Sequence, residues 1–327
     1  MRCFYNHDMT SIATTVTPTH NYDMPITKAH IKSFVYDIRD TDVDTFTCCP
    51  NFLRQPLWPS EIMPHWRDEA PAIEEPGMCH DWKYFDYAYF RIRRYMLAGG
   101  DPVGDTVEAA KECGKKIFFS YRMNDIHMLV RNPESRNIDS FWKSHPELRI
   151  GESAAAPAMR DRRTAALMQD YLQPQIRQHY LSVLEELTER YDIDGLEFDF
   201  MRAPCYFSPD RMEEGTAAMT GFVRDVRAML DRWGEKRGKR LELSARLPNT
   251  PAKALSIGLD VAAWANEGLV DILNIDSDSL NSTVNLDLEC YRAIAPRAQI
   301  LGELQFQIAP MKTLGYYCRQ KRANRPI

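Results

Sequence analysis

The stretch YDIDGLEFDFMR, residues 191–202, decides the fold of this chain. Its apolar part, residues 195–201, has the length of one strand and carries Glu197 and Asp199 two positions apart. Because alternate side chains of a strand lie on one face, both carboxylates are expected on the same side. A helix is expected directly before this strand, over residues 173–190, where apolar residues recur at helical spacing.

The same alternation of a short apolar run and a helical pattern extends in both directions. Strands are expected over residues 2–6, 43–48, 116–122, 195–201, 241–246, 270–275 and 299–305. Helices are expected over residues 26–40, 82–98, 105–113, 173–190, 210–234, 259–267 and 285–294. Strands that alternate with helices indicate a parallel sheet with right-handed crossovers. We therefore predict an α/β fold, a (β/α)8-type TIM barrel.

The number of expected strands stops at seven. Only 22 residues follow Gln305, which leaves room for one helix. A closed barrel of this kind needs eight strands. We therefore expect residues 1–327 to form a single catalytic (β/α) barrel domain that is truncated at its C-terminus and lacks the final β/α unit. The alternative is that the expected first strand is wrong.

The composition excludes several classes of protein. The net charge is -5, with 27% charged residues, so the chain lacks the basic face that nucleic-acid binding requires. No apolar window of about 18 residues spans a membrane, and no glycine-rich phosphate loop is present. Eight cysteines without a CxxC pair indicate reduced thiols and no zinc site. The N-terminus has no signal-peptide pattern, so we expect a cytoplasmic protein, or a secreted one if the start is incomplete.

Chemistry is expected where the strands end. Active sites of parallel barrels lie at the C-terminal ends of the strands. If Glu197 and Asp199 face the interior, Asp199 lies nearer the mouth and Glu197 about 6.6 Å deeper. Carboxylates this close repel each other, and such pairs commonly divide into an acid and a base. The alternative is an ion network in which arginines neutralise both acids.

The motif also resembles known families. The segment YDIDGLEFDFMRAP, residues 191–204, resembles the YDVDGIHxDYxRYP signature of the glycosyl-hydrolase-like family-10 group, hypothetical glycoside hydrolases with a TIM barrel. The matching residues are Tyr191, Asp192, Asp194, Gly195, Asp199, Arg202 and Pro204. The segment is similar to the DGxxxD of the α-amylase superfamily, which implies Asp199 as nucleophile. It is also similar to the DGxDxDxE of chitinases, in which Met201 takes the place of the catalytic Glu.

A second carboxylate is expected on the last strand. Glu303 lies in residues 299–305, and barrel glycosidases of the large retaining clan carry a nucleophile Glu near the end of strand seven. Those enzymes have Asn-Glu on strand four, where this chain has Asp199. Two such carboxyls cleave a glycosidic bond: one protonates the leaving oxygen, and the other attacks C1 or activates water. Asp199 and Glu303 are the predicted catalytic pair, with Glu197 in reserve. Glu303 on the barrel exterior would be a salt bridge instead.

Further residues near the expected mouth are candidates for substrate binding. They are Arg122, Asn124, His127, Arg202, Arg246, Asp276, Trp58, Trp142 and Tyr206. The arginines suit an anionic sugar, or else they neutralise the acids. The aromatic residues would stack on sugar rings, or else pack the loops. Asn124, His127 and Asp276 would bind hydroxyl groups of the sugar, or else stabilise turns.

These observations predict a glycoside hydrolase that cleaves a poly- or oligosaccharide by a two-carboxylate mechanism and without a cofactor. The arginines make an acidic or sulfated sugar one possible substrate. The expected partner is a carbohydrate, with no nucleic acid and no membrane. The alternative is a non-catalytic carbohydrate-binding barrel, in which Glu303 would face outward or lie far from Asp199. A metal-dependent lyase or isomerase ranks last, because only His7 and His127 lie near strand ends.

Overall fold

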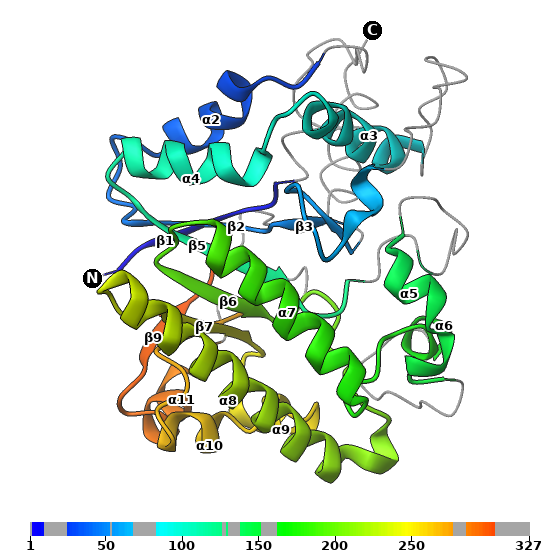
Figure 1. Cartoon of the computed structure of the whole chain (residues 1–327). Coiled ribbons are helices and arrows are strands. Elements are labelled where there is room, and N and C mark those ends of the chain that lie inside the picture. Colours follow the sequence, from blue (N-terminus) through cyan, green and yellow to red (C-terminus); the bar gives the residue numbers. More distant parts are fainter. Residues whose placement is uncertain are drawn as a thin grey trace, which may run out of the picture.

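The architecture is taken from a computed structural model of the chain (Figure 1). It describes residues 2–9, 25–52, 54–67, 83–125, 129, 138–151, 162–276 and 286–304. Strands and helices alternate through these residues, as the sequence pattern predicts. The two kinds of element separate into a sheet and a layer of helices on its outer side (Figure 1).

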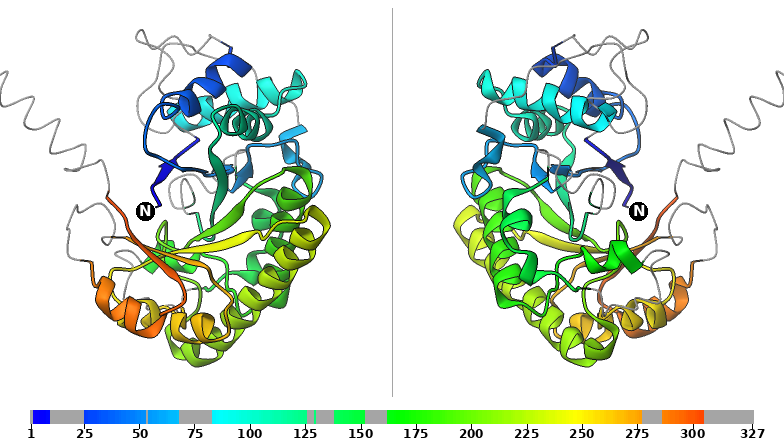
Figure 2. Two further views of the ribbon diagram at one scale, coloured as in Figure 1. Left: turned by 90° about the vertical axis from the view of Figure 1, so that its left-hand side faces the viewer. Right: turned by 90° about the vertical axis from the view of Figure 1, so that its right-hand side faces the viewer.

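The main sheet has seven parallel strands in sequential order. They are β1 (Phe4–His7), β2 (Thr45–Cys48), β5 (Lys116–Arg122), β6 (Gly195–Asp199), β7 (Glu242–Leu247), β8 (Ile272–Ile275) and β9 (Gln299–Gly302). Each strand pairs with the next in parallel. The sheet curls about the interior of the molecule (Figure 2). All seven expected strands are confirmed, and the α/β fold of barrel type with them.

The helices follow the strands, as expected for βα units. They are α2 (Lys28–Tyr36), α3 (Lys83–Leu97), α4 (Pro102–Glu112), α5 (Ser140–Ser144), α6 (Arg162–Ala166), α7 (Pro174–Arg190), α8 (Met212–Arg237), α9 (Pro251–Ser256), α10 (Val261–Asn266) and α11 (Leu288–Ile294). Helix α2 packs against α4, and α7 packs against α8. Gly114 follows α4 with φ +66, the left-handed conformation that ends helices and that glycine adopts without strain.

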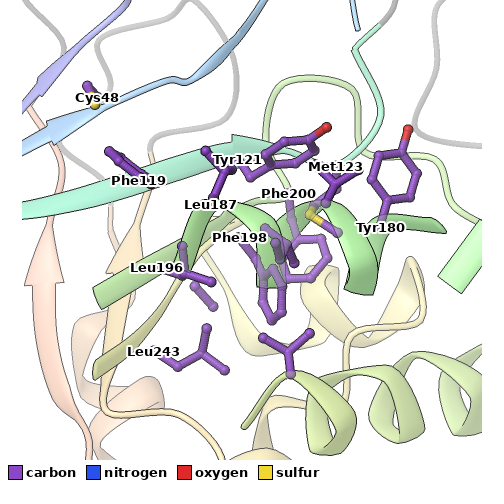
Figure 3. Close-up of a cluster of buried hydrophobic side chains, with 14 of the residues drawn as sticks. Cys48, Phe119, Tyr121, Met123, Tyr180, Leu187, Leu196, Phe198, Phe200 and Leu243 are labelled. Carbon is purple, nitrogen blue, oxygen red and sulfur yellow. The ribbon is translucent and has the colours of Figure 1, made fainter. Parts of the chain in front are cut away.

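The hydrophobic core lies between the sheet and the helices. Leu196 and Phe198 of β6 point outward and are fully buried. Figure 3 shows them in one cluster with Leu187 and Tyr180 of α7 and with Phe119 of β5. Alternate residues of the same strands must then face the other side, where Glu197 and Asp199 lie. The apolar run of the motif thus belongs to the outer face, and its acids to the inner face.

The sheet is open between its first and last strands. Among the described residues, β1 pairs only with β2, and β9 pairs only with β8. The described part of the chain is therefore an incomplete (β/α)8 barrel with seven strands, as the sequence predicts. No helix in the described ranges is both long enough and apolar enough to cross a membrane.

A small hairpin lies outside the expected strands. It consists of β3 (Asn51–Phe52) and β4 (Gln55–Pro56), which pair in antiparallel fashion directly after β2. Arg54 in its turn has φ +67, a conformation that is uncommon for a side chain other than glycine. The hydrogen bonds of its guanidinium, described below, account for this strained position.

Candidate functional site

Charged side chains gather at the C-terminal ends of the inner strands. Arg122, Asp199 and Arg246 occupy one register level on β5, β6 and β7. Asp276 directly follows β8, and Glu303 directly follows β9. Parallel strands end on the same side of a sheet, so five charged residues from five consecutive strands meet at one mouth. This is the location that the sequence predicts for the active site.

Arg246 joins three of these acids. Its Nε donates to Glu303 Oε2 at 2.6 Å, and its Nη2 donates to Glu303 Oε1 at 3.0 Å. The same Nη2 donates to Asp276 Oδ2 at 2.8 Å, and Nη1 donates to Asp199 Oδ1 at 3.0 Å. The guanidinium is thus bidentate to one carboxylate and singly bonded to two others. Such charge-assisted bonds in a partly buried site are strong and directional.

Glu303 has an unusual proton affinity. Burial raises the pKa of its carboxyl to about 7, against the pull of Arg246, and the nearby acids Asp276 and Glu197 add to the rise. Its side chain is 18% exposed, so it remains accessible from the mouth. At neutral pH this carboxyl therefore exists in both protonation states, as a general acid requires.

Glu197 forms a layer beneath this array. It is fully buried, and its two oxygens accept from Ser120 Oγ at 2.8 Å and Ser244 Oγ at 2.9 Å. Asn274 Nδ2 donates to it more weakly, at 3.4 Å. Burial raises the pKa of the Glu197 carboxyl, and the charge of Asp199 adds to that rise. The enclosed position suits a group that supports the mouth rather than one that touches a substrate.

Arg122 organises the opposite side of the mouth. The guanidinium is buried, and it binds Asp8 Oδ2 at 2.6 Å and Asp125 Oδ2 at 3.3 Å. Neither aspartate is among the site residues predicted from the sequence. Asp8 directly follows β1 as Asp276 follows β8, so the strand-end rule would have identified it. Arg202, in the loop after β6, has an exposed side chain.

Asn124 is a structural residue in this arrangement. Its amide nitrogen donates to Cys205 O at 2.7 Å and Gln169 O at 3.2 Å, and its oxygen accepts from Arg54 Nη2. The residue is fully buried. The expected contact with a sugar hydroxyl is therefore corrected: the amide holds the loop after β6 in place.

Arg54 is the center of this buried network, and no sequence pattern marks it. Its Nε donates to Asp125 O at 3.0 Å and its Nη1 donates to Tyr180 Oη at 2.7 Å. Gln169 also accepts from Nη1. Because these partners come from three separate segments, Arg54 ties the hairpin to the loops that surround the mouth.

The three aromatic candidates belong to the core. Trp58 is fully buried, and its Nε1 donates to Glu186 at 3.1 Å. Trp142 is buried beneath the guanidinium of Arg149, with Nε1 bonded to Leu167 O at 2.8 Å. Tyr206 is buried, and its hydroxyl donates to Phe200 O at 2.7 Å. None of these three rings offers an exposed face for sugar stacking, which corrects that expectation.

Two further residues complete the comparison with the sequence. His127 lies outside the described residues. Asp194, a residue of the matching motif, accepts from the backbone of Ile117 at 2.9 Å and from Lys239 Nζ at 3.2 Å. It lies at the N-terminal end of β6, opposite the mouth. Within the described ranges, no group of three or more His, Cys, Asp or Glu has the arrangement of a metal site.

Comparisons with known proteins were made for sequence and for structure. No protein-family model and no curated protein sequence matches the chain, so membership of the family-10 group stays a prediction from the motif. An N-acetylglucosaminidase of glycoside hydrolase family 18 from Paenibacillus barengoltzii is similar in structure, at 12% identity and TM-score 0.42. The match covers 92% of this chain and 67% of that one.

Two other solved structures are similar over most of this chain. A chitinase from Bacillus thuringiensis has 12% identity and TM-score 0.46, with 92% of this chain and 47% of that chain covered. A family-36 α-galactosidase from Geobacillus stearothermophilus has 10% identity and TM-score 0.43, with 98% and 41% covered. These neighbours are glycoside hydrolases, and the chain spans less than half the length of the latter two.

Proposed function

We propose that this protein is a glycoside hydrolase that uses Asp199 and Glu303 as its catalytic carboxyls. The observation that carries the proposal is their common partner: both bind the guanidinium of Arg246 at the mouth of the sheet. A non-catalytic barrel would instead have Glu303 facing outward or far from Asp199. The inward position of Glu303, beside Asp199, supports the catalytic alternative.

The two carboxyls differ in the way that the reaction demands. Glu303, with its pKa at about 7, retains a proton near neutral pH and would protonate the leaving oxygen. Asp199 accepts two hydrogen bonds at Oδ1, from Arg246 Nη1 and from the backbone N–H of Met201, each at 3.0 Å. These two donors hold the carboxyl of Asp199 in a fixed orientation, from which it would attack C1 or activate water.

The shared guanidinium also limits the distance between the two carboxyls. Its nitrogen atoms lie about 2.3 Å apart, so the nearest oxygens of Asp199 and Glu303 are separated by at most roughly 8 Å. Retaining enzymes separate their carboxyls by about 5–5.5 Å and inverting enzymes by about 6.5–9.5 Å. The limit admits either outcome, and the anomeric configuration of the first product distinguishes them.

The charge at the mouth bears on the substrate. The sequence suggests an acidic or sulfated sugar, which would need guanidinium groups to receive it. Arg122 and Arg246 are both bound to carboxylates, which supports their neutralising role over anion binding. A neutral poly- or oligosaccharide is therefore the substrate that we propose, and Arg202, an exposed residue of the loop after β6, is the arginine that an acidic substrate would use.

The test is the release of reducing ends from neutral and acidic polysaccharides, together with chromogenic aryl glycosides. We expect Asp199→Asn and Glu303→Gln each to lower kcat by roughly 10²–10⁴-fold, the range for loss of acid–base groups. Glu242→Gln is the matched control, because this carboxylate binds Arg2 at the opposite end of β7. It should keep its activity.

The outcomes separate the alternatives. Unchanged turnover in Asp199→Asn, with a folded protein, would remove Asp199 from the mechanism. Sugar binding without hydrolysis across the whole panel would instead establish the non-catalytic barrel. For the substrate, efficient hydrolysis of a uronic or sulfated polymer that is lost in Arg202→Ala would restore the prediction of an acidic substrate.

A further inference from the structure

We propose that Arg246 is a positioning residue that holds Asp199, Asp276 and Glu303 in one array, and that the excess of acids over this one cation keeps a single proton on the array, at Glu303. This inference rests on the proposed catalytic role of Glu303. It adds a residue that would act through the carboxyls rather than on the substrate.

The bond pattern requires an arginine. Four of the five N–H groups of Arg246 point to carboxylate oxygens: Nε and one Nη2 hydrogen to Glu303, the other Nη2 hydrogen to Asp276, and one Nη1 hydrogen to Asp199. The planar fork fixes the plane of the Glu303 carboxyl, because it binds both oxygens. A lysine ammonium has three rotatable donors and cannot reproduce this geometry.

The charges explain why a proton stays in the array. One guanidinium carries a single positive charge, and it faces the three carboxyls of Asp199, Asp276 and Glu303. Fully ionised, the four groups would sum to a charge of about -2 in a partly buried site, which is costly. A single bound proton halves this excess.

The surroundings of Glu303 place the proton there. Arg246 faces it from β7, Asp276 from the end of β8, and Glu197 from the layer beneath. The three acids that surround Arg246 thus compete for one cation. Glu303, the carboxyl with the raised pKa, is the one that takes up the proton. The negative charge of Asp276 favours the protonated form of Glu303.

Substitutions at two neighbours of Glu303 should shift its pKa in opposite directions. Removal of the positive charge in Arg246→Gln should raise the pKa of Glu303 by roughly 1–3 units, the usual effect of a neighbouring guanidinium. Removal of a negative charge in Asp276→Asn should lower it. Arg246→Lys keeps the positive charge but loses the bidentate fork. The pKa of Glu303 should therefore change little, while kcat should fall.

The experiment is a titration that does not require enzymatic activity. Protein labelled with ¹³C at the glutamate δ-carbon is followed by NMR from pH 4 to pH 9 (an operational window), and the Glu303→Gln spectrum assigns the resonance. The matched control is Arg227→Gln, which removes another buried arginine, one bound to Asp231 and Asp271 on the far side of the sheet. It should leave the titration of Glu303 unchanged.

Each result either supports or overturns the proposal. Opposite shifts in Arg246→Gln and Asp276→Asn support it, as does an alkaline shift of the upper limb of the pH–rate profile in Arg246→Gln. Equal titration of Glu303 in wild type and Asp276→Asn overturns it, and this comparison remains if Arg246→Gln does not fold. If the wild type is inactive on every substrate but the two variants still shift the pKa of Glu303 in opposite directions, the proposed hydrolase function is rejected and the role of Arg246 in the array stands.

Discussion

Replacing Glu303 with glutamine should make this protein more stable at alkaline pH. The pKa of the Glu303 carboxyl is about 7 in the folded protein, above its ordinary value of about 4.5. The folded state therefore binds this proton more tightly than the unfolded state does. It follows that the free energy of unfolding decreases as the pH rises from about 4.5 to about 7.

The size of the effect follows from the difference between the two pKa values. One pKa unit corresponds to about 1.4 kcal/mol, so the ionisation of Glu303 costs on the order of 3 kcal/mol of stability once the pH exceeds about 7. Its side chain is 18% exposed, so solvent screens the charge only in part. Glutamine has the shape of the protonated form and never ionises. The variant should match wild type near pH 4.5 and exceed it by up to about 3 kcal/mol near pH 8.

The assay is urea unfolding of both proteins at several pH values, with the difference in free energy plotted against pH. Carboxyls that lie far from Glu303 and Arg246 contribute equally in both proteins, so they cancel in that difference. A variant that is less stable than wild type at pH 8 would refute the reasoning. That result would mean that the ion pair with Arg246 outweighs the burial of the charge.

Two further predictions concern packing and thiol chemistry. Gly195→Ala should destabilise the protein by roughly 1–3 kcal/mol or more in urea unfolding, since its Cβ would lie 2.4 Å from the Phe118 ring; equal midpoints would contradict the packing. Cys49 should resist alkylation at pH 8 in the folded protein, because burial raises the pKa of its thiol to about 12, whereas the exposed Cys3 should be modified. Peptide mapping measures both, and rapid labelling of Cys49 would be the contrary result.

The sequence predicts the fold well where local pattern and tertiary role agree. Residues 116–122 form β5 as expected, and the helix expected over residues 173–190 is α7, Pro174–Arg190. Both are long and strongly patterned. The strand expected over residues 299–305 is β9 from Gln299 to Gly302, Glu303 and Leu304 lie after it, and Gln305 lies outside the described residues.

The site was harder to predict than the fold. Asp199, Glu303 and Arg246 were found because strand ends define the mouth of a barrel, and that rule depends on sequence position alone. The partner of each charge depends on three-dimensional contacts. Arg54 shows the limit: it lies in a two-residue turn without a motif, yet it is buried and binds three separate segments.

Aromatic residues were predicted least well, for a related reason. A tryptophan in a loop has the same sequence appearance whether its ring packs inward or faces a ligand. Trp58 follows the hairpin and is fully buried, and Glu186 on α7 accepts a hydrogen bond from its indole N–H. Only the packing of α7 against the hairpin decides between the two alternatives.

The meeting of three carboxylates at Arg246 also constrains how this protein can change over evolutionary time. Substitutions at Asp199, Asp276 and Glu303 should not have additive effects, because each one redistributes the same guanidinium among the remaining acids. A loss at one position alters the benefit of keeping the others. Arg246 and its three acids should therefore be conserved together. A lineage that acquires a new reaction at this mouth would have to replace the arginine early, before any of the acids could vary independently.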